Sequence, residues 1–359
     1  MIPWWVNDFG ISCAQAAYEE IMRKNISQGI VTRKLEDRIS EAFNMPNVIA
    51  MNSGSSALYA ILKSLGLRKD QEIIIQARTW VATLNSALLA NLKVKIVDID
   101  SETLCMNLDH LKKLINVNTG AILITHMNGR SAFMNELADL CKSKQIFLIE
   151  DAAQAIYSKS GDKFLGTFGD ASIFSLSTAK IISSGQGGLA LIKDENLARK
   201  IRDFRTQGVE STHEPRTWDM VGGNFRYTDI LAAIALVQLN QSHDRILACN
   251  KIYDLYSKFF SQQRKSKFLI KNGNEEIQTY VEIVTEDRDS LRDYLRNNGI
   301  ESRIFYPPIS KAKQLQESEE FPIANKYASN GLYLPSGPGQ KMIDIDKVID
   351  CMDRYESSH

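Results

Sequence analysis

The sequence has few of the residues that build metal sites and disulfide frameworks. Its 359 residues include five cysteines and five histidines. The cysteines are scattered and form no C-x-x-C pair, which argues against both a zinc site and a disulfide framework. They are Cys13, Cys105, Cys141, Cys249 and Cys351. We therefore predict that the protein holds no metal ion.

Long apolar runs and an excess of charge are missing as well. No segment approaches the roughly 18 consecutive apolar residues that a membrane span needs, and the opening "MIPWWVNDFG" lacks the basic start and apolar core of a signal peptide. Lysine plus arginine (43) balances aspartate plus glutamate (43), so no bulk charge favours a nucleic acid or an anionic membrane as partner. These absences predict a cytoplasmic protein that binds a small molecule.

What the chain does contain is a regular alternation of strand-like and helix-like segments. The run "NVIAMNS" (47–53) predicts a strand, "SSALYAILKSLGL" (55–67) a helix and "QEIIIQA" (71–77) a second strand. The alternation continues through "IFLIEDAA" (146–153). It predicts an α/β fold with a mostly parallel sheet covered by helices on both faces.

Beyond about residue 240 the pattern changes. A long helical stretch, "LVQLNQSHDRILACNKIYDLYSKFF" (236–260), leads into a segment that reads strand, helix, strand over 280–309. We therefore predict a large domain of residues 1–240 and a smaller C-terminal α+β domain of residues 241–359. The first 20 or so residues are expected to pack on the small domain.

Ligands of parallel α/β sheets bind beyond the carboxyl ends of the strands, and four such ends carry suitable side chains. In "NSGSSAL" (52–58), Gly54 permits a tight turn, and Ser55 and Ser56 open a helix whose N-terminus suits a phosphate. The alternative is that Ser55 is only a helix cap. In "ARTWVAT" (77–83), Trp80 either stacks on a planar ring or packs into the core.

The third and fourth ends carry charge. In "FLIEDAAQA" (147–155), Glu150 and Asp151 end an apolar run, where a carboxylate needs a cation or a strong donor; a helix cap is the alternative. In "FGDASIFSLSTAKIISSGQGGLAL" (168–191), Lys180 precedes a bend rich in glycine. A buried lysine readily loses its charge and can form a Schiff base, whereas a surface turn is the commoner place for a lysine.

Together the four ends describe one ligand. A phosphate cradle, a stacking aromatic ring, a carboxylate for a ring nitrogen and a lysine for an aldehyde are what pyridoxal 5'-phosphate requires. The joint pattern predicts this cofactor far more strongly than any of its parts.

In the order and spacing of these segments the sequence resembles the sugar aminotransferase family DegT/DnrJ/EryC1/StrS, whose members have the fold type I architecture of pyridoxal phosphate enzymes. The resemblance covers most of the chain and implies a seven-stranded, mostly parallel sheet in the large domain. The matching segments are "QGIVTRKLEDRISEAF", "NSGSSAL", "TWVATLNSALLANLKVKIVDID", "IEDAAQA", "GTFGDASIFSLSTAKIISSGQGG", "FRTQG", "GGNFRYTDILAAIALVQL" and "YPPI".

The resemblance also implies roles for individual residues. Lys180 matches the Schiff-base lysine, which anchors the cofactor and then shuttles a proton between the substrate carbon and the cofactor. Asp151 matches the aspartate that pairs with the pyridine nitrogen, and Gln154 lies beside the ring and its phenolic oxygen. The remaining matches are Trp80 to the stacking aromatic, Ser55, Ser56 and Ser175 to the phosphate-binding groups, and Asn224 to an asparagine that reaches the phosphate from the neighbouring subunit.

These matches imply a partner subunit and a reaction. The asparagine implies a homodimer with shared active sites. The amino donor in this family is commonly L-glutamate, and the acceptor is usually a keto sugar attached to a nucleotide, for amino-sugar, surface-glycan such as O-antigen, or secondary-metabolite biosynthesis. Because pyridoxal phosphate and pyridoxamine 5'-phosphate alternate, ping-pong kinetics are expected.

Three places depart from the family pattern or leave their role open. Small residues precede the lysine in "SLSTAK", where many relatives have proline, tyrosine or histidine. In "THMNGRSAFMNEL" (125–137), where many relatives have His-Leu-Tyr-Gly, Arg130 either contacts a substrate carboxylate or phosphate or is a solvated surface residue. Trp4, with Trp5, either lines a sugar pocket or anchors the N-terminus on the small domain; Tyr306, in "YPPI", is a further candidate substrate contact.

Two other functions are compatible with the same scaffold. A pyridoxamine phosphate-dependent keto-sugar dehydratase carries histidine where the lysine stands, and a non-catalytic binding or regulatory relative is expected to lose the lysine or the aspartate. Since Lys180 and Asp151 are both present, the sequence favours the aminotransferase.

Overall fold

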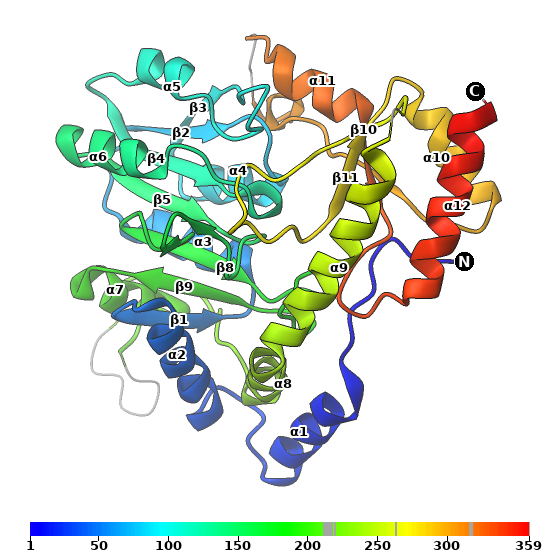
Figure 1. Cartoon of the computed structure of the whole chain (residues 1–359). Helices are drawn as coiled ribbons and strands as arrows, with labels where there is room; N and C mark the ends of the chain where they lie inside the picture. The colour runs from blue at the N-terminus through cyan, green and yellow to red at the C-terminus, as the bar shows by residue number, and fades with distance from the viewer. Residues whose placement is uncertain (211–217, 219, 263, 316–318, 359) are drawn as a thin grey trace.

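The computed structural model describes residues 1–210, 218, 220–262, 264–315 and 319–358. Two sheets organise this part of the chain, one of seven strands and one of four (Figure 1). A two-stranded hairpin, β6 (Lys159–Ser160) and β7 (Lys163–Phe164), lies outside both. The predicted α/β class is confirmed.

The large sheet has the strand order β1-β9-β8-β5-β4-β2-β3. All pairings within it are parallel except those of β9, which runs antiparallel to β1 and β8. The predicted seven-stranded, mostly parallel sheet is therefore confirmed. Its strands are β1 (Asn47–Met51), β2 (Glu72–Gln76), β3 (Lys93–Val97), β4 (Thr119–Thr125), β5 (Phe147–Asp151), β8 (Ala171–Ser175) and β9 (Gly188–Ile192).

Helices cover this sheet on both faces, as predicted. Successive side chains of a strand point to opposite faces, so Ile73 and Ile75 of β2 join one apolar cluster and Ile74 joins another. The first cluster is covered by α3 (Gly54–Ser64), α4 (Val81–Leu89) and α7 (Glu195–Arg205), and the second by α2 (Ile30–Phe43), α5 (Leu108–Leu114), α6 (Met134–Lys144) and α8 (Asp229–Asn240).

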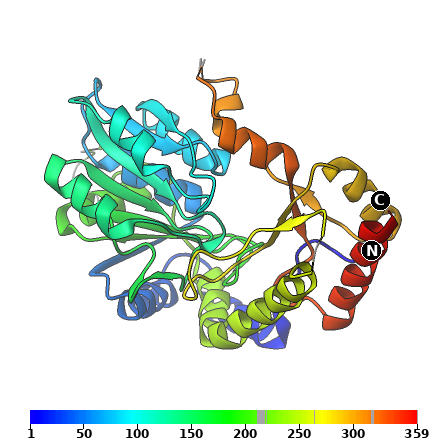
Figure 2. The ribbon, with the colours of Figure 1, turned by 45° about the horizontal axis from the view of Figure 1, so that its top comes forward.

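The smaller unit is built on an antiparallel sheet with the order β10-β11-β13-β12 and has an apolar cluster of its own. Figure 2 shows it, in yellow to red, beside the large sheet. Its elements are β10 (Lys267–Phe268), β11 (Val281–Val284), β12 (Arg303–Ile304), β13 (Gly331–Leu334), α9 (Ser242–Phe260), α10 (Arg288–Asn297), η2 (Ile309–Lys311), α11 (Pro322–Asn330) and α12 (Met342–Ser358). The division after residue 240 falls between α8 and α9 and stays a prediction.

The first residues of the chain lie against the small sheet. Ile2 forms a bridge with Ile300, and Trp5 forms one with Ser336. The chain then continues into α1 (Gly10–Met22), which lies next to α8 (Figure 1). The N-terminus therefore crosses from the small unit to the large one.

Of the helices in the described residues, none combines the length and the apolar character that crossing a membrane would take.

Candidate active site

A cavity of about 530 Å³ lies at the carboxyl ends of the parallel strands, where the small sheet faces the large one. Side chains from both units line it. Eight of the residues predicted from the sequence are in its wall: Trp4, Ser55, Trp80, Asp151, Gln154, Ser175, Lys180 and Tyr306. The fold thus brings together groups that are up to about 300 residues apart in the chain.

Lys180 follows β8 and contributes to the wall of this cavity. Burial lowers the pKa of its amine to about 8, although the charge of Asp151 acts in the opposite direction. The ammonium of a lysine in water has a pKa near 10.4. Near physiological pH the neutral, nucleophilic fraction of Lys180 is therefore much larger than that of a lysine in water.

Asp151 ends β5, and its carboxylate is held by two donors. The Thr83 hydroxyl donates to Oδ2 at 2.7 Å, and the Ala153 N–H donates to Oδ1 at 3.1 Å. Thr83 is in turn joined to Thr79 (2.8 Å between hydroxyl oxygens), and Thr79 to Thr125 (2.9 Å). This chain of hydroxyls fixes the orientation of the carboxylate at the edge of the cavity.

The neighbouring Glu150 points to the other face of the strand, and it is not among the described residues that line the cavity. Its carboxylate accepts hydrogen bonds from the His126 ring (2.9 Å) and from the N–H groups of Gly166 (2.8 Å) and Gly169 (2.7 Å). Burial acts to raise the pKa of Glu150, but the hydrogen bonds and the His126 charge outweigh it and lower the pKa. The sequence analysis predicted that a carboxylate at this strand end needs a strong donor. Asp151 and Glu150 each have donors of their own.

Beyond the carboxyl end of β1, the N-terminus of α3 forms part of the wall through Ser53, Gly54 and Ser55. The first N–H groups of a helix have no partner within it, so this end suits an anion. A Cβ atom at Gly188 would collide with the backbone of Ser53 and Gly54. Glycine at position 188 therefore lets β9 approach the helix end closely.

Ser56 does not fill its predicted place. Its hydroxyl donates to Asn52 Oδ1 (2.6 Å), while its N–H donates to the Ser53 hydroxyl (3.0 Å) in a capping box. Within the described residues the cavity wall includes Ser55 but not Ser56. Ser56 therefore stabilises the start of α3, and Ser53, which the sequence analysis missed, takes a place at the cavity.

A tryptophan, a tyrosine and a glutamine surround the middle of the cavity. Trp80 is 52% exposed, so it does not pack into the core, and its ring contacts Tyr306 edge-on at 5.0 Å between centroids. Gln154 donates through Nε2 to the Tyr306 hydroxyl (3.2 Å) and accepts at Oε1 from the Asn128 N–H (2.8 Å). Both ends of the Gln154 amide are thereby fixed.

The model of the DegT/DnrJ/EryC1/StrS aminotransferase family matches residues 12–353. The chain belongs to this family. It is 31% identical over 337 residues to GDP-perosamine synthase of Escherichia coli O157:H7, with 92% of each chain covered. It is 26% identical over 373 residues to the spore coat polysaccharide biosynthesis protein SpsC of Bacillus subtilis, with 98% of this chain and 96% of that one covered.

A solved structure shares the fold of the whole chain. PseC of Helicobacter pylori, an aminotransferase involved in the biosynthesis of pseudoaminic acid, superposes with a TM-score of 0.94 at 22% identity and with 99% of each chain covered. Membership of the family confirms the predicted enzyme class, a pyridoxal phosphate-dependent aminotransferase, together with the predicted cofactor.

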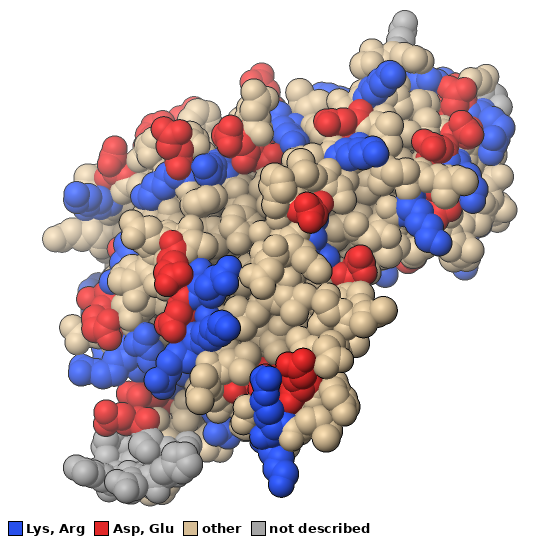
Figure 3. Space-filling model, turned by 60° about the horizontal axis from the view of Figure 1, so that its bottom comes forward, with Lys and Arg blue, Asp and Glu red and all other residues tan. Residues whose placement is uncertain are grey.

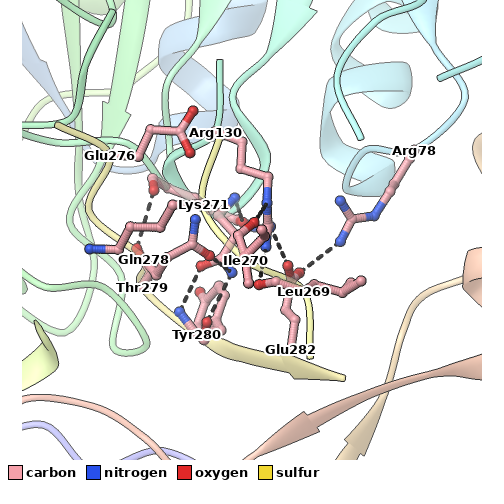
Figure 4. A network of polar contacts seen from close by, with 12 residues as sticks. Arg78, Arg130, Leu269, Ile270, Lys271, Glu276, Gln278, Thr279, Tyr280 and Glu282 are labelled. Carbon is pink, nitrogen blue, oxygen red and sulfur yellow. Dashed lines mark hydrogen bonds and ion pairs between the residues drawn. The ribbon is translucent and has the colours of Figure 1, made fainter. Parts of the chain in front are cut away.

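Arg130 of this aminotransferase corrects one interpretation in the sequence analysis, that of a solvated surface residue. Its side chain is 1% exposed and does not appear in the cavity wall formed by the described residues. Its guanidinium pairs with the Glu282 carboxylate and donates to the Leu269 carbonyl at 2.9 Å (Figure 4). Arg130 therefore serves the junction of the two sheets, and its predicted contact with a substrate stays a prediction.

Trp4 and Trp5 differ in their surroundings. The Trp4 ring lines the cavity and stacks on Tyr280, with 5.6 Å between centroids. Trp5 is buried and forms the bridge with Ser336 of the small unit. The pair therefore anchors the N-terminus while Trp4 presents one ring to the cavity.

Asn224 is not among the described residues that line the cavity of its own chain. Its side chain is exposed, and its Oδ1 accepts a hydrogen bond from Arg226 Nε at 3.0 Å. Its predicted role at the phosphate of a neighbouring subunit stays a prediction.

The sequence analysis missed several residues of the wall, among them Tyr280, Arg303 and Tyr333. All three belong to the small unit, and no strand-end argument pointed to them. The aromatic cluster "RIFYPP" around Tyr306 was the available signal for this part of the site.

Proposed function

We propose that this aminotransferase moves an amino group from L-glutamate to a keto sugar linked to a nucleoside diphosphate, with Lys180 as the residue that binds pyridoxal phosphate covalently. The observation that carries the proposal is the meeting of Lys180, the Asp151 carboxylate and the N-terminus of α3 in one cavity. A lysine, a fixed carboxylate and an anion site are the groups that this cofactor requires.

Each part of the cofactor has a matching group in the cavity. The phosphate is assigned to the N-terminus of α3 with Ser55 and Ser175, because helix N–H groups and hydroxyls bind anions. The ring nitrogen is assigned to Asp151, whose carboxylate is held by Thr83 and the Ala153 N–H. Trp80 is assigned to the ring face, since its indole lies at the wall and half exposed.

Pyridoxal phosphate, when bound, supplies an electron sink for the electrons released at the substrate carbon. Lys180 supplies the base. Burial lowers the pKa of its amine to about 8, so the free amine can accept the proton from the donor carbon and later return a proton to the acceptor carbon. Because the donor product leaves before the acceptor binds, we expect ping-pong kinetics.

The sugar and its nucleotide are assigned to the wall that the small unit contributes. Trp4, Tyr280 and Tyr333 offer aromatic surface there, and Arg303 offers a cation near the Trp4 ring (4.3 Å to its centroid). The names of two relatives support a nucleotide-linked sugar: GDP-perosamine synthase and a dTDP-4-dehydro-2,3,6-trideoxy-D-glucose 4-aminotransferase, to which the chain is 26% identical. We accordingly assign the protein to amino-sugar biosynthesis for a surface glycan such as the O-antigen.

A homodimer with shared active sites completes the proposal. Exposed apolar side chains gather on α1, the segment that follows it and the first residue of α2: Ile11, Tyr18, Ile21, Met22, Ile26 and Ile30. Figure 3 turns this side forward and shows a broad stretch with few charged side chains. Such a surface suits a partner subunit, and the exposed Asn224 is assigned to the partner's phosphate site.

We also propose that the enzyme works in the cytoplasm. Support comes from its cysteines, all five of which are free and buried. Secreted proteins more often use cysteines in disulfides.

A screen of keto sugars linked to GDP, dTDP or UDP tests the function. With glutamate as donor, release of 2-oxoglutarate should require one of these acceptors and should disappear in Lys180→Ala. Turnover by Lys180→Ala at the wild-type rate would contradict the role of Lys180. Turnover with free sugars or oxo acids but with none of the nucleotide-linked sugars would contradict the acceptor class.

A further inference from the structure

The main chain around Lys180 is held by side chains from three distant segments. Four successive carbonyl oxygens, those of residues 178–181, accept hydrogen bonds from outside the loop. The donors are Trp5 Nε1 (3.3 Å) and Asn7 Nδ2 (2.9 Å) to Thr178, the Tyr280 hydroxyl (2.7 Å) to Ala179, Asn7 Nδ2 (3.1 Å) to Lys180, and Arg245 Nε (2.6 Å) to Ile181.

Asn7 has a central place among these donors, because its amide contacts the carbonyls on both sides of residue 179. The orientation of that amide is set by Arg245 of α9. The guanidinium donates to Asn7 Oδ1 and, at 2.8 Å, to the Asp8 carbonyl. A guanidinium has only donors, so it must face the amide oxygen of Asn7. The NH2 group of Asn7 is then directed to the Thr178 and Lys180 carbonyls.

Arg245 is itself fixed. Its side chain is buried, and its three nitrogens bind Ile181, Asp8 and Asn7. The N-terminal segment is fixed as well, because Trp5 and its neighbours pair with the small unit. The carbonyls around Lys180 are thus bound to groups that have little freedom to move.

We propose that Asn7, oriented by Arg245, is a positioning residue that holds the main chain of Lys180 so that its amine projects into the cavity. This inference rests on the proposed role of Lys180 as the lysine that binds pyridoxal phosphate. A lysine side chain has four rotatable bonds between its Cα atom and its nitrogen. Any movement of the Cα atom therefore adds to the movement that these bonds already allow the amine. Displacement of a reacting group by about 1 Å can cost roughly a hundredfold in rate.

Three variants test the positioning role. Asn7→Asp keeps the size of the side chain and its contact with Arg245 but removes the NH2 donor. Asn7→Ala removes both contacts. Asp8→Asn is the matched control, because it changes the charge of the next residue and keeps the carbonyl that Arg245 binds. Thermal unfolding of each variant identifies any that fail to fold, and either Asn7 variant is sufficient for the test.

Two measurements give the outcome. In the cofactor-free protein, hydrogen exchange of a peptide covering residues 177–185 should be at least about tenfold faster in Asn7→Asp than in wild type and unchanged in Asp8→Asn. After addition of pyridoxal phosphate, borohydride makes the adduct at Lys180 permanent, and mass spectrometry measures its amount. This adduct should form roughly ten- to a hundredfold more slowly in Asn7→Asp than in wild type.

The possible failures are distinguishable. If wild type itself forms no adduct at Lys180, the proposed function is overturned and this inference with it. If wild type forms the adduct and Asn7→Asp forms it at the same rate with unchanged exchange, only the inference is overturned. A general loss of stability would accelerate exchange in peptides throughout the large sheet, and that result would also overturn it.

Discussion

Arg130 and Glu282 form a buried ion pair across the junction of the two sheets, and neither side chain lies in the cavity wall of the described residues. Arg78 binds the other oxygen of the same carboxylate at 2.7 Å (Figure 4). Burial acts to raise the pKa of Glu282, but the charges of Arg130 and Arg78 outweigh it and lower the pKa. Loops that follow β4 and β2 are therefore attached to β11 by one carboxylate.

Removal of Arg130 should destabilise the protein without removing a group from the cavity. In Arg130→Met, the buried Glu282 keeps only Arg78 as ionic partner, and loss of one partner of a buried pair costs about 3–5 kcal/mol. Urea unfolding of the cofactor-free protein measures this free energy. Arg130→Met combined with Glu282→Gln should cost less than the sum of the two single changes. Strictly additive costs would show that the two groups do not interact.

The low pKa of Lys180 predicts the pH dependence of cofactor capture. The neutral amine is the nucleophile, so capture of pyridoxal phosphate by the cofactor-free protein should accelerate as the pH rises and level off above about 8. A stopped-flow series from pH 6 to 10, followed at the absorbance of the bound cofactor, gives the midpoint. A midpoint above 10, as for a lysine in water, would show that the protein does not lower the pKa of Lys180.

The same pKa predicts a stability difference. Because the pKa of Lys180 is lowered from 10.5 to about 8 on folding, the unfolded chain binds more protons than the folded one between these pH values. The resulting penalty on folding is complete below pH 8 and disappears as the pH rises towards 10.5. Lys180→Met should therefore stabilise the cofactor-free protein by about 2–3 kcal/mol at pH 7. Urea unfolding should show a smaller gain in the free energy of unfolding at pH 10 than at pH 7. An equal gain at both pH values would indicate that the methionine stabilises the protein by better packing instead.

Thr83 should be needed to hold the Asp151 carboxylate, to which the ring nitrogen of the cofactor is assigned. Thr83→Val keeps the shape of the side chain but removes the hydroxyl that donates to Asp151 at 2.7 Å. The loss of one donor to a buried carboxylate costs about 1–3 kcal/mol, so we expect weaker retention of pyridoxal phosphate on dialysis and a lower kcat. Thr83→Ser, which keeps the hydroxyl, should behave nearly as wild type. Equal cofactor retention by the valine and serine variants would show that this bond is unimportant.

Shared active sites predict complementation between inactive subunits. Asn224→Ala and Lys180→Ala homodimers should each be nearly inactive. Refolding them as a mixture should restore roughly a quarter of the wild-type activity, since about half of the dimers are hybrids and each hybrid contains one intact site. The mixture would stay as inactive as its components if each subunit formed a complete site by itself.

The sequence predicted most of the large sheet, because its parallel strands are buried on both faces and read as apolar runs; β4 is buried along its whole length. Lys180, Asp151 and Ser55 were predicted from the same pattern, since each stands where such a run ends. The long-range partners could not be predicted. Arg130 and Glu282 are 152 residues apart, and only the docking of the small sheet brings them together.

The residues that position the site residues could not be predicted from the sequence for a related reason. Thr83 lies inside α4, where its hydroxyl looks like that of any helix residue, and Asn7 lies in a segment without periodicity. Their importance comes from what they bind: the carboxylate of Asp151 and the carbonyl of Lys180. The small residues before Lys180, unexplained from the sequence, belong to the loop whose carbonyls accept hydrogen bonds from Asn7.

The most direct measurement asks where pyridoxal phosphate binds covalently. The purified protein, loaded with the cofactor and treated with borohydride, is digested and its peptides are weighed. We predict that the peptide containing Lys180 carries one phosphopyridoxyl group and that Lys180→Ala carries none. A stoichiometric group on any other lysine, or an unchanged yield in Lys180→Ala, would contradict the account.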